Sequence, residues 1–328
     1  MSFVRYNTED SVISSETVVR GMWTSDTASL TTFFTSSIAT SSYYLNVYDT
    51  NATSSLQFAI QYGHISGSGS TPINNSIAED TPTRVTYGQY RSLIYNDENS
   101  AFVFGTVTSP DFYAINIARS RYKESIKPGS LALTLKSGSF QITLTDDSVA
   151  SGSITNFIGS NRYYNLVSGS AGTVTSSLAG NSGSYGLLFP DLGVILLNAR
   201  ALSAPTSSGG ISFSSGTGAS SNNNAELFKI ISGSSSSGNF KLQSQETVSS
   251  RYFFTRVKNS EFNYTTNPSI INSSGSLLYD TLIDNPQTYV TTVGMYNDNN
   301  ELLAVAKLSR PLVKDFTKEA LIRVKLDY

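Results

Sequence analysis

Residues 320–328, Ala-Leu-Ile-Arg-Val-Lys-Leu-Asp-Tyr, alternate between two kinds of side chain up to the last residue of the sequence. One face of an extended chain would carry Ile322, Val324, Leu326 and Tyr328, and the other Leu321, Arg323, Lys325 and Asp327. A period of two is typical of a half-buried β-strand. We therefore expect a strand that ties the C-terminus into a sheet instead of leaving it as a solvated tail.

The same alternation predicts two β-hairpins. The first covers residues 131–145 and turns at Ser137-Gly138-Ser139, and the second covers residues 288–308. The second turns at residues 297–300, an Asn/Asp run of the kind that tolerates left-handed backbone. Pro311 should end the strand that follows, so the charged run 312–318 is expected to be a solvated loop.

The first third of the chain mixes helix and strand signals. Thr81-Pro82 offers a helix start, and an apolar stripe continues through Tyr95. Residues 43–48 and 56–60 predict a strand pair, whereas residues 25–34 favour a short helix. Helices are thus expected to be the minority in an α+β region.

Stretches rich in Gly and Ser at 168–183, 207–221 and 232–238 are expected to be long surface loops. We predict three domains, with an α+β domain at 1–126, a loop-rich β insertion at 127–250, and a C-terminal antiparallel segment at 251–328 that packs with the N-terminal part. The predicted fold class is β-rich and mainly antiparallel with minor α, in β-sandwich-like domains with a Gly/Ser-rich middle region.

The composition narrows the classes of function. Only 14% of residues are charged, against about 25% in a typical soluble protein. The net charge of −2 offers no positive field for nucleic acid. The chain has no cysteine, which excludes disulfides, thiol catalysis and zinc–thiolate sites. No secretion signal and no apolar run of membrane length occur, so we expect synthesis in a cytoplasm and no membrane insertion.

Catalytic patterns are weak. The single histidine, His64, cannot build a histidine metal cluster, and no G-x-S-x-G motif accompanies it, so we interpret it as structural or as a subunit contact. Neighbouring carboxylates such as Asp146-Asp147 point apart and favour turn chemistry over a glycosidase pair. Calcium sites are a further alternative at the loops 97–99 and 297–301, although neither loop has the spacing of an EF-hand. We expect no enzyme activity and no cofactor.

Tyrosine-rich segments and the last strand are the candidate interfaces. The chain holds 19 Tyr and 17 Phe, and tyrosine loses little rotamer entropy when it is buried at a contact. Each such segment also has a plain interpretation as sheet core. The residues selected as interface candidates are Leu321, Arg323, Lys325, Tyr328, Tyr163, Tyr164 and Tyr252.

Three regions of the chain carry a resemblance, namely residues 111–124 with 127–131, residues 185–193, and residues 261–268 with 293–298 and 301–308. They resemble virion structural proteins of contractile-tailed bacteriophages, especially those of marine bacteria. The resemblance runs from about residue 101 to the C-terminus and implies a tail or baseplate component. It implies a virion location, after assembly in the host cytoplasm, with other virion proteins as partners.

These observations leave three classes of function to be tested. The first is a non-enzymatic structural subunit of a symmetric homo- or hetero-oligomer, whose edge strands pair with neighbouring subunits. The second is a receptor- or glycan-binding fibre or adhesin, with exposed aromatics in a groove. The third is a polysaccharide depolymerase, which needs carboxylates from distant segments facing one cleft.

Overall fold

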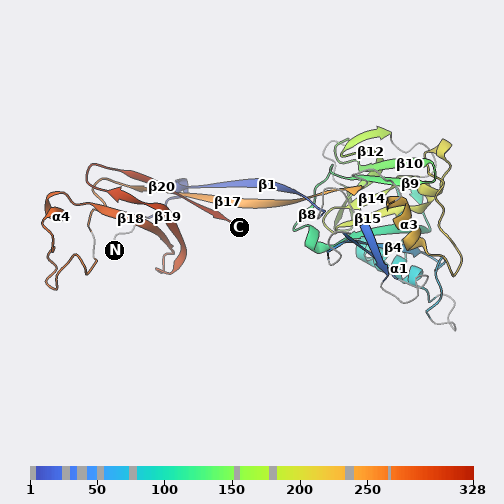
Figure 1. The fold of residues 1–328 in the computed structure, drawn as a ribbon, viewed down its shortest axis with the longest axis horizontal. Coiled ribbons are helices and arrows are strands. Elements are labelled where there is room, and N and C mark those ends of the chain that lie inside the picture. Colours follow the sequence, from blue (N-terminus) through green and yellow to red (C-terminus); the bar gives the residue numbers. More distant parts are fainter. Residues whose placement is uncertain are drawn as a thin grey trace. The chain divides into compact units, whose positions relative to one another are not determined.

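The computed structural model describes residues 5–23, 30–34, 43–49, 55–73, 80–150, 156–176, 183–232, 240–264 and 267–328. Strands dominate these residues and pair antiparallel (Figure 1). The predicted β-rich, β-sandwich-like fold class is confirmed.

The chain divides into two compact units. Unit 1 combines residues 1–17 with 247–328, and unit 2 comprises residues 18–246. The chain passes from one unit to the other within β1 (Ser11–Gly21) and again within β17 (Gln243–Val257). This division differs from the three domains expected from the sequence, because the segments expected to separate at 126/127 share one sheet.

Unit 2 is built on a twelve-stranded antiparallel sheet with the order β16-β9-β10-β12-β14-β15-β7-β4-β3-β2, and β11 and β13 also pair with β12. Its strands are β2 (Leu30–Phe34), β3 (Leu45–Asp49), β4 (Leu56–His64), β7 (Asp111–Ile117), β9 (Ala132–Ser137), β10 (Phe140–Asp146), β11 (Asn156–Ile158), β12 (Asn161–Ser170), β13 (Thr173–Ser176), β14 (Gly186–Phe189), β15 (Val194–Asn198) and β16 (Phe240–Lys241). Short strands β5 (Val103–Phe104) and β6 (Val107–Thr108) pair with each other, and β8 (Ser125–Ile126) pairs with β17.

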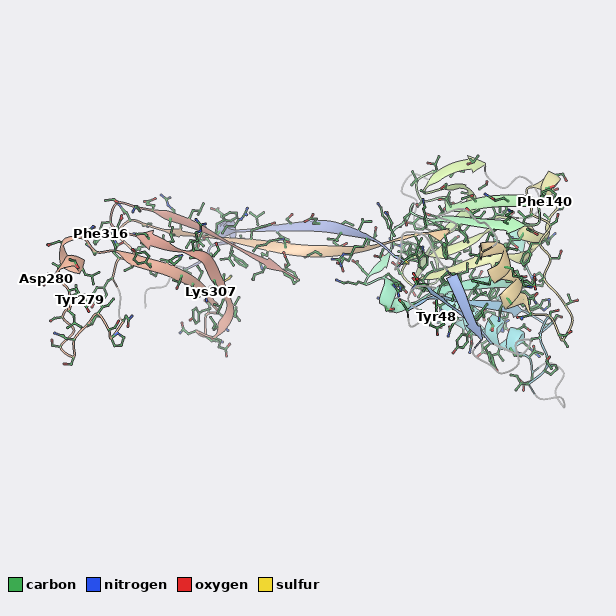
Figure 2. All side chains as sticks on the ribbon, in the orientation of Figure 1. Tyr48, Phe140, Tyr279, Asp280, Lys307 and Phe316 are labelled. Atoms are coloured by element: carbon green, nitrogen blue, oxygen red, sulfur yellow. The ribbon has the colours of Figure 1, made fainter. Side chains whose placement is uncertain are left out.

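The predicted hairpin at 131–145 is confirmed as β9–β10. Ser137 is the partner of Phe140, so Gly138 and Ser139 form a two-residue turn. Gly138 has φ of 58°, a left-handed conformation that favours glycine. Phe140 opens β10 with an exposed side chain (Figure 2). The predicted strand pair in the first third is confirmed as β3–β4.

Two expectations in this unit are wrong. The Gly/Ser stretch 168–183 contains the end of β12 and all of β13, which pair as a hairpin through residue 176. Leu30–Phe34 is strand β2, paired with β3, where the sequence favoured a helix; residues 24–29 of that helix lie outside the described residues. In both places backbone pairing with a strand already in the sheet outweighs local propensity.

Helix α1 (Pro82–Tyr95) confirms the predicted helix. Thr81 caps it by accepting a hydrogen bond at Oγ1 from the Arg84 amide, and Asn96 closes it in the left-handed conformation. Its buried Tyr87 and Tyr90 pack on Phe112 of β7, with ring centroids 5.4 and 5.6 Å apart. Helix α1 therefore covers one face of the sheet through an aromatic cluster.

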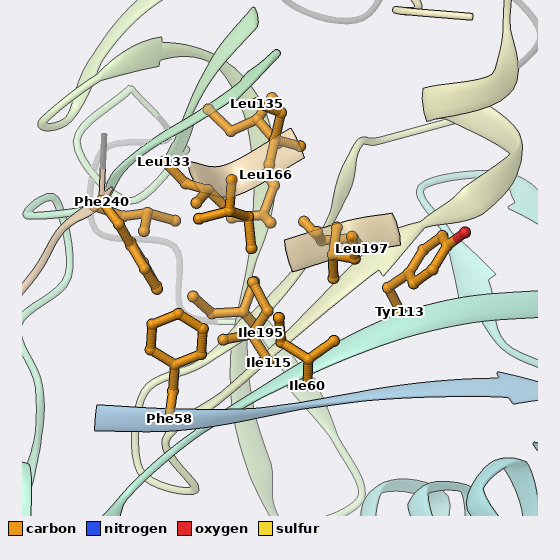
Figure 3. Close-up of a cluster of buried hydrophobic side chains, with 14 of the residues drawn as sticks. Phe58, Ile60, Tyr113, Ile115, Leu133, Leu135, Leu166, Ile195, Leu197 and Phe240 are labelled. Atoms are coloured by element: carbon orange, nitrogen blue, oxygen red, sulfur yellow. The ribbon is translucent and has the colours of Figure 1, made fainter. Parts of the chain in front are cut away.

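The other face of the sheet encloses the larger core. Helix α3 (Asn223–Ser232) contacts both β9 and β4, which are far apart in strand order, so the sheet curls around it. Phe58 of β4 and Phe240 of β16 meet with ring centroids 5.2 Å apart, and Trp23 packs against both rings. Figure 3 shows Phe58 and Phe240 together with other apolar side chains of this core, among them Ile115, Leu133 and Leu197. The short elements α2 (Ala199–Ser203), η3 (Arg119–Arg121) and η4 (Thr206–Ser208) complete unit 2.

Unit 1 contains two small sheets. In the first, β17 lies between β1 and β20 (Ala320–Asp327), and β17 and β20 pair without interruption over eight residues. The second is the predicted hairpin, confirmed as β18 (Thr288–Tyr296) and β19 (Leu302–Lys314). Short helices η1 (Thr8–Asp10) and α4 (Thr281–Asp284) also belong to this unit.

Strand β19 continues past Pro311, where the sequence predicted its end and a loop from 312. The register jumps from Thr292↔Lys307 to Val290↔Leu312, so residues 308–311 bulge out of the ladder. Proline lacks an N–H group and fits there without the loss of a ladder hydrogen bond. The strand then resumes to Lys314.

Candidate interaction surface

Unit 1 buries few apolar side chains. Among its described residues, only three hydrophobic side chains are buried, Val257, Ile322 and Val324. They pack with partly buried residues of both sheets, which gives a thin β-sandwich-like core. Unit 2, by contrast, holds two extensive clusters.

The same unit exposes many large apolar side chains. Those more than half exposed are Val12, Ile13, Tyr264, Leu278, Tyr279, Ile283, Tyr289, Leu302, Leu303, Val305, Phe316, Leu321 and Tyr328. Tyr279 and Phe316 are labelled in Figure 2. Single exposed apolar residues are ordinary, whereas the number of them in unit 1 makes its surface the candidate interaction surface.

The outward face of the β18–β19 hairpin is the most regular part of this surface. Alternation turns Val293, Met295 and Ala306 toward the core of unit 1. It turns outward the residues that we call the outer hairpin face, namely Tyr289, Gly294, Tyr296, Leu302, Leu303, Val305 and Lys307. A Cβ atom built on Gly294 would lie 3.0 Å from Cε2 of Tyr296, so the tyrosine ring lies over this glycine. Thr292, the register partner of Lys307, is exposed on the same side, so the face is apolar apart from these two residues.

A second face brings three predicted candidates together. Tyr252 of β17 is the register partner of Lys325 of β20. The Arg323 guanidinium carbon lies 5.5 Å and the Lys325 Nζ atom 6.0 Å from the centroid of the Tyr252 ring. These are cation–π contacts. Leu321 follows on the same alternation and is 69% exposed.

The charges of this second face are largely paired within the chain. Lys325 Nζ lies 3.0 Å from Asp327 Oδ1, and Arg256 Nη2 lies 2.7 Å from Glu319 Oε2. The hydrogen bond to Asp327 raises the pKa of Lys325, and the bonds from Ser250 and then Lys325 lower the pKa of Asp327. Because the cations already have partners, this face does not demand an acidic ligand.

Tyr328 also lies in unit 1. Its backbone N–H donates to the Ser249 carbonyl oxygen over 2.9 Å, and its own carbonyl accepts from the Ser249 amide over 3.2 Å. The last residue of the sequence is therefore tied into the sheet, as expected from the sequence. Its side chain is exposed.

The other two predicted candidates belong to unit 2. Tyr164 of β12 is only 7% exposed and so is not a surface residue, because β12 lies in the middle of the sheet. Tyr163 is half-buried, with its ring 6.1 Å from that of Phe189. The plain interpretation as sheet core holds for this pair.

Sequence reasoning missed the segment 267–287. It contains α4 and exposes Leu278, Tyr279 and Ile283. Its backbone hydrogen bonds, such as Leu278 N–H to the Ile270 carbonyl over 2.9 Å, run within the segment. The signal available in the sequence was this apolar run without strand or helix periodicity.

His64 and its surroundings form a packed polar network. The Ser66 amide donates to His64 Nδ1 over 3.1 Å, and burial lowers the pKa of the imidazole against the opposing effect of Asp111. The Asp111 carboxylate accepts from the Tyr62 and Ser215 hydroxyls over 2.9 and 2.7 Å. The two bonds to Asp111 link β4, β7 and the 207–221 loop.

Carboxylate and amide oxygens of the suggested calcium loops and of the pair Asp146-Asp147 accept hydrogen bonds from backbone amides. Asp97 accepts from the amides of Asn99 and Ser100, and Asn297 Oδ1 accepts from the amides of Asn299 and Glu301. Asp146 and Asp147 likewise accept from the Gly129 and Asn165 amides. Within the described ranges, no three His, Asp or Glu side chains are grouped to hold a metal ion.

Comparisons with known proteins add no family. The chain matches no protein-family model, no curated protein and no solved structure. Of the helices in the described part of the chain, none has both the length and the apolar character needed to cross a membrane.

Proposed function

We propose that this chain is a non-enzymatic structural subunit of a bacteriophage virion, in the tail or baseplate, that acts through protein–protein interfaces in a symmetric assembly. The observation that carries the proposal is a contrast within the described part of unit 1, where three hydrophobic side chains are buried and many more are exposed. Its partners are other virion proteins.

Burial energetics support assembly. Each square ångström of apolar surface removed from water stabilises a protein by about 25 cal/mol. Subunits that assemble permanently bury roughly 2,000 Å² or more, with charge depleted at the centre. Unit 1 offers exposed apolar side chains of this kind, and on its outer hairpin face Lys307 is the one charged residue.

The virion part of the proposal rests on the sequence. Residues 101–328 resemble virion structural proteins of contractile-tailed phages, and the cysteine-free composition suits a protein made in a reducing cytoplasm. Unit 1 includes the third of the resembling regions, residues 261–268 with 293–298 and 301–308.

A glycan-binding role has less support in the geometry. Sugar-binding sites use aromatic faces that are open to the ligand, whereas Tyr252 is half-buried and carries the side chains of Arg323 and Lys325 over its ring.

The first test is the mass of the purified full-length chain by light scattering, followed by electron microscopy of the same sample. Rings, tubes or defined oligomers would support an assembly subunit. The second test is mass spectrometry of phage particles purified from a lysate in which this gene is expressed from the phage genome. Stoichiometric presence supports the virion assignment, and absence from intact particles contradicts it.

A further inference from the structure

We propose that the outer hairpin face docks against the same face of a second copy of this chain, about a two-fold axis. This inference rests on the proposed function, because it names one partner of the assembly subunit. The face is defined by Tyr289, Gly294, Tyr296, Leu302, Leu303, Val305 and Lys307.

The chemistry of the face is compatible with itself. A two-fold contact places one patch against its own copy, so any cluster of like charges in it would be repelled. Lys307 is the one charged residue of the outer hairpin face. The side chains around Val305 are Tyr and Leu, which pack with their own kind without a polar counterpart.

The area is sufficient for a specific contact. Tyr289, Tyr296, Leu302, Leu303 and Val305 are each between 43% and 68% exposed. With a fully buried aromatic removing 150–250 Å², covering these five side chains would bury on the order of 500 Å² per copy. Two copies together would bury about 1,000 Å², the lower bound expected of a biological interface.

The β18–β19 hairpin would be stabilised by a layer that packs on its outer face. It is a two-stranded sheet, and two strands are marginally stable in water unless further layers pack on them. Its inner face packs only on the thin core of unit 1. A second copy supplies an equivalent apolar sheet on the outer face, and sheets stacked in this way lie about 10 Å apart.

The first experiment compares Leu303→Asp with Leu278→Asp in the full chain by sedimentation velocity over a range of concentrations. Both leucines belong to unit 1 and are more than half exposed, but only Leu303 lies on the outer hairpin face. We expect a wild-type dimer, or a multiple of two copies, that persists in L278D. The L303D variant should require at least tenfold more protein to associate. A monomeric wild type, or equal association of both variants, overturns the proposal.

The second experiment uses the absence of cysteine from the chain. A single cysteine at Val305 should be joined between copies by a short bismaleimide, whereas one at Phe157, an exposed residue of β11 in unit 2, should not. Equal cross-linking at the two positions contradicts the two-fold contact. If the chain enters particles but V305C does not cross-link, the docking proposal fails while the proposed function stands. Absence from particles contradicts the proposed function instead.

Discussion

Lys314 is the most deeply buried charged residue of unit 1. It is fully buried, and its Nζ atom donates to the carbonyl oxygens of Asn259 and Asp315 over 2.9 and 2.8 Å and to Asn263 Oδ1 over 2.8 Å. Replacing it with methionine keeps the apolar stem but leaves three acceptors without their donor. We expect K314M to destabilise unit 1 by about 3 kcal/mol.

Urea unfolding would measure this loss of stability. Hydrogen exchange of the β18 and β19 amides would locate the loss in unit 1. Arg310→Met is the matched control, because Arg310 is an exposed cation of the same strand. A K314M variant as stable as R310M would show that the three hydrogen bonds contribute nothing net to the free energy of unfolding.

Asp315 gives unit 1 a dependence on acid. Hydrogen bonds from Lys318 and then Thr317 lower the pKa of its carboxyl group to about 2, from an ordinary value of 3.8. A group whose pKa is lower in the folded state stabilises the protein at pH values above its unfolded pKa. This stabilisation is lost as the pH falls through the folded pKa. The contribution is therefore complete above about pH 4 and disappears toward pH 2.

We expect Asp315→Asn to lower the stability of unit 1 at neutral pH. The further loss of stability between pH 4 and pH 2 should be smaller in this variant than in the wild type. Urea midpoints measured across this range test the expectation. Asp284→Asn, at an exposed carboxylate in α4, is the control and should leave the slope unchanged. An identical slope in wild type and D315N would remove Asp315 as its cause.

At the scale of single residues, the sequence predicts some of the exposed and buried positions but not all of them. Tyr252, Arg323 and Lys325 were selected separately, from tyrosine content and from the last strand, and the structure places them on one face. Tyr164 was selected by the same tyrosine argument but is buried, because residue type alone does not show which strands are central. Lys314 was expected in a solvated loop, since a charged residue in a Pro-containing run has no local sign of burial.

The two faces of β20 carry different energetic weights. Ile322 is one of the three buried hydrophobic side chains of unit 1, whereas its neighbour Leu321 is 69% exposed. We expect Ile322→Ala to cost about 2–4 kcal/mol of unfolding free energy and Leu321→Ala less than about 0.5 kcal/mol. Equilibrium urea denaturation of the two variants checks this, and equal losses would contradict the assignment of faces.

The curled sheet of unit 2 depends on aromatic contacts between distant strands. Phe240 of β16 packs on Phe58 of β4 and on Trp23, with ring centroids 5.2 and 4.7 Å apart. We expect Phe240→Ala to destabilise unit 2 by about 3–5 kcal/mol, because it leaves a cavity beside these rings.

Trp23 is the only tryptophan of the chain, so its fluorescence reports directly on this contact. Phe140→Ala provides the control, since Phe140 is an exposed residue of β10. If F240A and F140A unfold at the same denaturant concentration with the same emission spectrum, the aromatic contact does not hold the curled sheet together.

Elements with strong local signals were predicted, and elements that depend on distant partners were not. The β9–β10 hairpin and helix α1 have turn and cap residues that are legible in the sequence, namely Gly138, Thr81 and Pro82. Strands β2 and β13 lack such signals and form because β3 and β12 offer them an edge. The bulge at 308–311 likewise depends on the register of β18, which a single sequence does not reveal.

At the scale of the whole molecule, the three apolar clusters respect the division into units. The two larger ones draw all their residues from 18–246, and the small one draws its residues from unit 1. The predicted boundary near residue 250 is close to the end of unit 2. The boundary at 126 is not present, because β7 pairs with β4 on one side and β15 on the other. Unit 1 combines residues from both ends of the chain, 1–17 and 247–328, and β1 pairs with β17 in its sheet.

This segregation predicts the behaviour of a fragment. Residues 18–246 contain both large clusters, so the fragment should fold alone, with the Trp23 emission of the full chain and cooperative unfolding. It lacks the exposed apolar residues of unit 1, so it should sediment as a monomer at concentrations where the full chain assembles. If the fragment forms the same oligomers as the full chain, the assembly contacts belong to unit 2. A fragment that fails to fold would mean that β1 and β17 residues beyond its ends are needed to hold the curled sheet.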